Sequence, residues 1–65
     1  MNKDIVAGTW KEIRGKVMRR WSLLTDSDLD EIEGTRLELE GLLQKRYGYA
    51  KERAHEEVGE FFDTL

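Results

Sequence analysis

The sequence predicts an all-α protein of four short helices, arranged as two α-hairpins that pack on each other. Apolar residues recur at spacings of three and four, which places them along one face of a helix. Thr-x-x-Asp and Thr-x-x-Glu segments stand where helices would begin, and glycines stand where they would end. The chain contains no proline, the residue that most strongly disrupts a helix interior.

We expect a single domain over residues 1–65, with the hairpins at approximately 1–33 and 34–65. The first helix is expected to run from about Thr9, or from a frayed start near Lys3, to Trp21. Thr9 and Glu12 have the spacing of a capping box, in which two side chains bind the otherwise unpaired N–H groups of the first turn. A turn at residues 22–24 leads to the second helix.

The remaining helices follow the same pattern. Thr25 begins a short second helix, which ends at Gly34, where the chain turns. Thr35 and Glu38 form another capping box at the start of the third helix. Gly48 supplies the left-handed residue that ends this helix at low energetic cost, and a fourth helix follows from Ala50.

The apolar stripes of these helices define the expected core. It consists of Trp10, Ile13, Val17, Trp21, Leu24, Leu29, Ile32, Leu39, Leu42, Leu43, Tyr47, Ala54, Val58 and Phe61.

An internal similarity relates the two predicted hairpins. Within the 26-residue window that starts at Gly8, six residues are identical to those 26 positions later, and Gly15 coincides with Gly41. A structural duplication and a shared set of capping signals both explain this similarity. Glycine inside a helix costs about 1 kcal/mol relative to alanine, so we expect a neighbouring helix to cross closely at Gly15 and Gly41.

Composition limits the class of protein. A chain of 65 residues buries only about 60% of its unfolded surface on folding. It has no cysteine, no apolar run near the roughly 20 residues of a membrane span, and no apolar signal-peptide core. By elimination, we expect a cytoplasmic protein.

Charge is unevenly distributed along the chain. Residues 1–24 carry six basic and two acidic side chains, a net charge of +4, whereas residues 25–65 carry five basic and twelve acidic side chains, a net −7. We expect the basic first helix to neutralise part of the acidic remainder when they dock. The alternative is a basic face that binds an acidic partner.

A set of short motifs, spread over roughly residues 1–58, has a characteristic order. It consists of Trp10-Lys11, Gly15-Lys16, Trp21, Leu24-Thr25-Asp26, Asp28, Ile32-Glu33-Gly34, Leu39, Gly41, Gln44 and Arg46-Tyr47-Gly48-Tyr49. On these residues the chain resembles the CsbD-like family of small bacterial stress proteins. The resemblance implies two crossed α-hairpins similar to a SAM-domain-like bundle, and production under general stress control, but it supplies no catalytic residue. The chain departs from the family pattern at Ser22, at Ser27 and in its Phe61-Phe62 tail.

Metal binding and catalysis find little support in the sequence. His55 is the only histidine, and we expect it to be a solvated surface group. Asp26, Asp28 and Asp30 have the spacing that begins a calcium-binding EF-hand loop, but Glu31 and Leu37 occupy the positions that require glycine and glutamate. No catalytic triad spacing and no phosphate-binding glycine loop occurs. We expect no enzyme activity, no metal and no cofactor.

Nucleic-acid binding is one alternative function. Basic residues precede an aromatic residue in both predicted hairpins, and the candidate contacts are Lys16, Arg19, Arg20, Lys45 and Arg46. The net charge of −3 and the isoelectric point near 5.1 oppose this interpretation, because binding to phosphates requires a basic surface.

Protein binding or self-association is the other alternative. Phe61, Phe62 and Leu65 at one end of the chain, or Ile5 and Val6 at the other, can exceed the apolar surface that a small bundle covers. The competing interpretation folds the tail back over the hairpins. The sequence thus predicts a small non-enzymatic stress-response protein with a binding or structural role.

Overall fold

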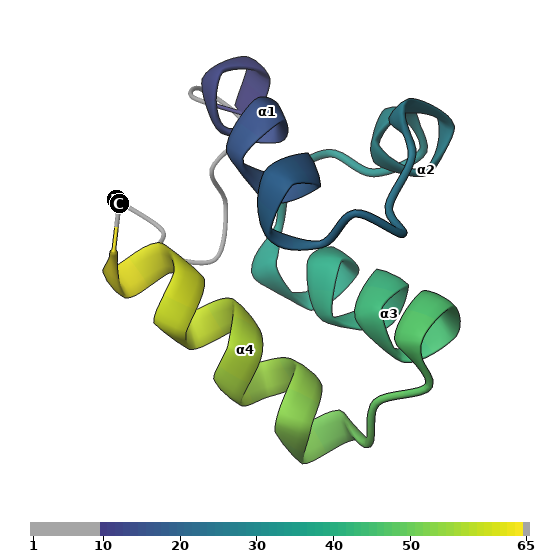
Figure 1. The fold of residues 1–65 in the computed structure, drawn as a ribbon, viewed down its shortest axis with the longest axis vertical. Coiled ribbons are helices and arrows are strands. Elements are labelled where there is room, and N and C mark those ends of the chain that lie inside the picture. Colours follow the sequence, from purple (N-terminus) through teal and green to yellow (C-terminus); the bar gives the residue numbers. More distant parts are fainter. Residues whose placement is uncertain (1–9, 65) are drawn as a thin grey trace.

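The computed structural model describes residues 10–64, which form four helices joined by short connections (Figure 1). The helices are α1 (Trp10–Arg20), α2 (Asp26–Asp30), α3 (Arg36–Tyr47) and α4 (Lys51–Asp63). No strand occurs in this part of the chain, so the predicted all-α class is confirmed. The expected cap at Thr9 and the frayed start near Lys3 lie outside the described residues.

The predicted caps of α2 and α3 are present. The Thr35 hydroxyl accepts a hydrogen bond from the Glu38 backbone N–H at 3.1 Å, and the Glu38 carboxylate accepts one from the Thr35 N–H at 3.2 Å. Thr25 and Asp28 form the same reciprocal pair at α2. Gly48 ends α3 in the left-handed conformation, with φ of 69°. Local sequence therefore sets these boundaries.

The helices form two layers around the core. Figure 1 shows α1 and α2 in the upper half of the molecule, above α3 and α4, which pack side by side as a hairpin in the lower half. Whether α1 and α2 make a second hairpin that crosses the first, as in SAM-like domains, stays a prediction.

The buried side chains match the predicted core closely. Ile32 and Tyr47 are only partly buried and pack against its edge. The Trp21 and Phe61 rings, with centroids 5.1 Å apart, connect the end of α1 to the end of α4. The buried apolar residues are Trp10, Ile13, Val17, Trp21, Leu24, Leu29, Leu39, Leu42, Leu43, Ala54, Val58 and Phe61.

The expected close helix crossing at Gly15 and Gly41 is wrong. Both glycines are exposed, and among residues 10–64 a Cβ atom added at either would meet no group of another element within 4 Å. The tightly packed glycine is Gly34, where φ is +91° and an added Cβ would lie 2.9 Å from Trp10 Cγ. Glycine is required in the turn before α3, because both backbone conformation and space exclude a side chain there.

The 26-residue similarity is matched by only part of the structure. Helices α1 and α3 end at Arg20 and Tyr47, 27 residues apart, but α2 has 5 residues and α4 has 13. Duplication stays a prediction.

Candidate interaction surfaces

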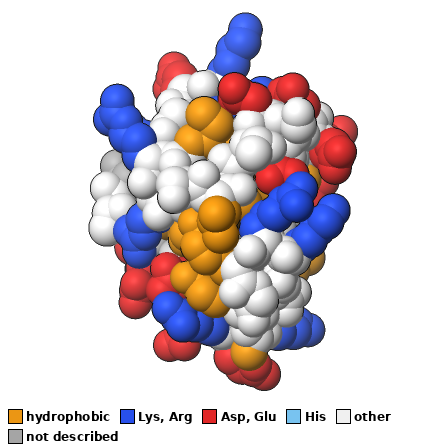
Figure 2. All heavy atoms as spheres, turned by 45° about the vertical axis from the view of Figure 1, so that its right-hand side comes forward, with side chains coloured by type: hydrophobic (Ala, Val, Ile, Leu, Met, Phe, Trp, Pro, Cys, Tyr) orange, Lys and Arg blue, Asp and Glu red, His pale blue; other side chains and the backbone are white. Residues whose placement is uncertain are grey.

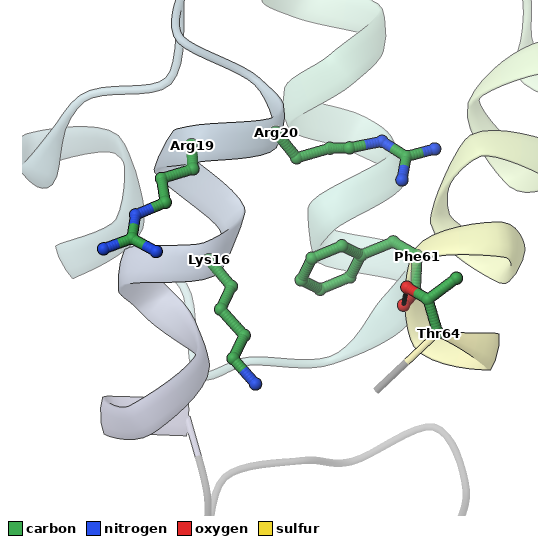
Figure 3. Close-up of a pocket in the computed structure, with 5 residues that line it drawn as sticks. All are labelled: Lys16, Arg19, Arg20, Phe61 and Thr64. Carbon is green, nitrogen blue, oxygen red and sulfur yellow. Dashed lines mark hydrogen bonds between the residues drawn. The ribbon is translucent and has the colours of Figure 1, made fainter.

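A shallow basic groove lies between the C-terminal halves of α1 and α4. It has a volume of about 420 Å³ and is lined by Lys16, Arg19, Arg20, Phe61 and Thr64; we call it the α1–α4 groove. In Figure 3 the Lys16 and Arg20 side chains extend on either side of the Phe61 ring, while the Arg19 guanidinium points away from α4. The groove therefore combines cationic walls with an aromatic floor.

The cations of this groove differ in their partners. Arg20 lies 3.9 Å from a Glu57 carboxylate oxygen and 3.7 Å from one of Glu60, distances too long for strong hydrogen bonds. Lys16 and Arg19 are exposed and form no ion pair with any residue from 10 to 64. Both remain accessible to an anionic partner.

The second predicted basic site, Lys45 and Arg46, is not part of this groove, and Arg46 has a structural role instead. Its guanidinium donates two hydrogen bonds to Asp28, from Nε to Oδ2 at 3.0 Å and from Nη2 to Oδ1 at 2.5 Å. The Asp28 side chain is only 5% exposed. This bidentate pair ties α2 to the end of α3 and leaves Lys45 as the exposed cation there.

The environment of Asp28 stabilises its ionised form. Hydrogen bonds from the Arg46 side chain and from the Thr25 backbone N–H lower the pKa of Asp28 from 3.8 to about 2, although burial opposes them. The same pairing raises the pKa of Arg46. Asp28 therefore stays charged at any physiological pH.

An apolar surface lies where the α1–α2 and α3–α4 connections meet. The Leu23 backbone N–H donates a hydrogen bond to the Tyr47 hydroxyl at 3.1 Å, and the Tyr47 and Tyr49 ring centroids are 5.2 Å apart. Leu23 is 53% exposed, and the Arg53 guanidinium lies over the Tyr49 ring at 4.2 Å. Figure 2 shows hydrophobic side chains gathered on this side of the molecule, with Lys and Arg side chains around them.

A second shallow groove runs between α3 and α4. It has a volume of about 430 Å³, and its lining includes Leu37, Glu40 and His55. His55 is exposed, as predicted, but its Nδ1 also lies 2.9 Å from an oxygen of the buried Glu40 carboxylate, a hydrogen bond that the sequence did not indicate. Glu40 is thus a buried acid whose partner is itself solvated.

Within residues 10–64, the acidic side chains form no cluster of three or more groups that could hold a metal ion. The aspartates with EF-hand-like spacing bind arginines instead. Arg14 forms ion pairs with Asp26 and Asp30 at 3.5 and 2.8 Å, and Asp28 binds Arg46. These contacts also show the first helix neutralising acidic residues elsewhere in the chain, as expected.

The C-terminal phenylalanines pack against the body of the protein. Phe61 is 4% exposed and belongs to the core, as expected, and it also lines the α1–α4 groove, so its role as a partner contact stays a prediction. Phe62 is half-buried, with its ring edge on Phe61 and the Arg36 guanidinium 4.8 Å from its centroid. Leu65, Ile5 and Val6 lie outside the described residues.

Sequence reasoning found the cations of the α1–α4 groove but not the groove itself. It also missed the pairing of Arg46 with Asp28 and of Glu40 with His55. The partners in these two contacts are separated by 18 and by 15 positions in the sequence. Asp28 did carry one signal, its place three residues after a capping threonine. Glu40 carried none, because it lies beside Leu39 and looks like a surface position.

Fold and surface together define a small all-α protein with two shallow surface grooves, each lined in part by charged side chains. None of the described helices has both the length and the apolar composition needed to cross a membrane.

Comparison with known proteins places the chain in a family. The family model described as CsbD-like matches residues 4–56. A UPF0337 protein of Bordetella pertussis is 54% identical over 63 residues, which cover 97% of this chain and 96% of that protein. A UPF0337 protein of Pseudomonas aeruginosa is 49% identical over 65 residues, with 100% of both chains covered. The UPF0337 protein YjbJ of Escherichia coli is 52% identical over 58 residues, covering 89% of this chain and 84% of that protein. The chain therefore belongs to the CsbD-like family, which confirms the predicted resemblance.

Proposed function

We propose that this chain is a non-enzymatic protein of the bacterial stress response that acts in the cytoplasm by binding an acidic surface of another protein. The observation that carries the proposal is the α1–α4 groove, where Lys16, Arg19 and Arg20 lie together at one end of α1. The stress-response part rests on the resemblance to CsbD-like stress proteins, and the binding part rests on the groove.

The groove suits a weak and reversible contact. An ion pair between exposed side chains contributes about 0.2–1 kcal/mol, so two or three such pairs give modest affinity. The Debye length is about 8 Å at physiological ionic strength, so added salt weakens these contacts. Binding through this groove is therefore expected to fall steeply with ionic strength.

A charge-reversal experiment tests the proposal. The variant Lys16→Glu/Arg19→Glu replaces two exposed cations that have no ion-pair partner among residues 10–64, so its helical content should be unchanged. The matched control Lys11→Glu/Lys45→Glu makes the same change in net charge at exposed positions outside the groove. We expect the tagged wild-type protein and the control to capture the same proteins from stressed cells at low salt, and the groove variant to lose them. Equal capture by both variants would contradict the proposal.

The same exposed cations favour a second candidate, weak binding of nucleic acid. The engagement of Arg46 by Asp28 opposes it, because fewer cations then remain for the many phosphates of a nucleic acid, and so does the net charge of −3. Titration of short DNA, followed by tryptophan fluorescence at low and moderate salt, decides between the two. Salt-sensitive binding supports nucleic acid, and no binding at low salt removes it.

A further inference from the structure

The exposed face of α4 carries a row of acidic side chains. Its members share one face of the helix because they are spaced four, four and three residues apart, and all are exposed. The buried residues of α4 lie on the opposite face. We call this set the acidic row; it consists of Glu52, Glu56, Glu60 and Asp63.

Most of the acidic row has no partner within the described part of the molecule. Only Glu60 lies within ion-pair distance of a cation, the Arg20 guanidinium. Glu52, Glu56 and Asp63 form no ion pair with any residue from 10 to 64. Arg53 lies on the same helix, but its guanidinium lies over the Tyr49 ring.

The acidic row and the exposed cations of α1 are opposite in charge. Lys16 and Arg19 are three residues apart, which separates them by about 4.5 Å along the helix axis, and Glu52 and Glu56 are four residues apart, or about 6 Å. Lys16 and Arg19 have no ion-pair partner among the described residues, and neither do Glu52 and Glu56. Each molecule therefore presents a basic helix face and an acidic helix face whose charges are opposite and similarly spaced.

We infer that the occupant of the α1–α4 groove is a second copy of this chain, whose acidic row docks on Lys16 and Arg19. This inference rests on the proposed function and names its partner. The contact is heterologous, because the two patches differ, so each copy can bind one neighbour through α1 and another through α4. The net charge of −3 opposes this association, which is therefore weak and sensitive to salt.

Sedimentation velocity on the full chain tests the inference. At low salt, the wild-type sedimentation coefficient should rise between a low and a high protein concentration, and about 0.5 M salt should return it to the monomer value. Loss of two exposed pairs should weaken self-association about tenfold in Lys16→Glu/Arg19→Glu. It should also weaken self-association in Glu52→Lys/Glu56→Lys, by less, because the lower net charge of that variant opposes association less. The control Lys11→Glu/Lys45→Glu, with the same net charge as the first variant, should associate more strongly than that variant does.

Mixing the two charge-reversed variants provides the decisive measurement. In the mixture, the acidic row of Lys16→Glu/Arg19→Glu can bind the unchanged Lys16 and Arg19 of Glu52→Lys/Glu56→Lys. The two substituted faces are also opposite in charge. We expect the equimolar mixture to associate where neither variant does alone. A wild-type protein that stays monomeric at high concentration and low salt would overturn the inference, as would a groove variant that associates as the wild type does. If the wild type is monomeric but the groove variant still loses its cellular partners, the inference fails and the proposed function stands.

Discussion

At the scale of single residues, the bidentate pair between Asp28 and Arg46 links two helices through a buried carboxylate. Asp28 has two roles, because it also completes the capping box with Thr25. It joins the start of α2 to the end of α3, two segments that share no local sequence signal. The same contact gives Arg46 a structural partner, and its role as a binding cation stays a prediction.

The low pKa of Asp28 predicts how stability depends on pH. A carboxyl group with a depressed folded-state pKa contributes stability above its unfolded pKa of 3.8, and this contribution is lost as pH falls through about 2. We expect the urea midpoint of the wild type to fall between about pH 4 and pH 2.

The variant Asp28→Asn tests this prediction. It should be less stable than the wild type at pH 7, and the difference should shrink as the pH approaches 2. The stability of the variant should still fall in acid, because the pKa of a second carboxyl group, that of Glu38, is also lowered. Burial alone would raise the pKa of Glu38, but hydrogen bonds from Thr35 and Glu33 outweigh it and lower that pKa. A pH-independent difference between the two proteins would contradict the account.

At the scale of elements, local sequence signals set the helix boundaries, whereas tertiary contacts set how the helices pack. Sequence reasoning predicted the caps at Thr25 and Thr35 and the stop at Gly48, because each depends on residues within one turn. It failed at Gly41, because the absence of a side chain can equally mark a crossing helix or an open surface. Only the packing of the other helices distinguishes these two cases.

Glycine substitutions test this distinction. Gly41→Leu, which a close helix crossing would make strongly destabilising, should leave the melting temperature unchanged or raise it, because the site is open and leucine favours helix. Gly34→Ala should reduce the free energy of unfolding by about 1–3 kcal/mol, since it combines positive φ with a clash on Trp10. Thermal unfolding followed by circular dichroism measures both. A sharp loss of stability in Gly41→Leu would restore the crossing-helix interpretation.

At the scale of the whole molecule, the sequence predicted the all-α class and most of the core. The periodic spacing of apolar residues predicts which side chains are buried. It correctly predicted that Trp10 and Leu43, far apart in the chain, both belong to the core. The candidate site was predicted only in part. Lys16, Arg19 and Arg20 follow from composition, but their position beside Phe61 depends on how α1 and α4 meet, which no local pattern encodes.

The uneven charge of the chain is partly resolved within the molecule. Arg14 and Arg20 of α1 pair with acids of α2 and α4. Among the exposed charged residues that have no such partner in the described part of the chain, Lys16 and Arg19 lie on α1, and Glu52, Glu56 and Asp63 lie on α4. These residues belong to the two faces proposed to associate.

The central claim is that these two faces form the binding surface, and a dilution series of the isotope-labelled protein at low salt tests it most directly by nuclear magnetic resonance. As concentration rises, backbone amide signals of residues 16–20 and 52–63 should shift together, and salt should reverse the shifts. Shifts confined to the surface around Leu23, Tyr47 and Tyr49, or no concentration-dependent shift at all, would contradict the claim.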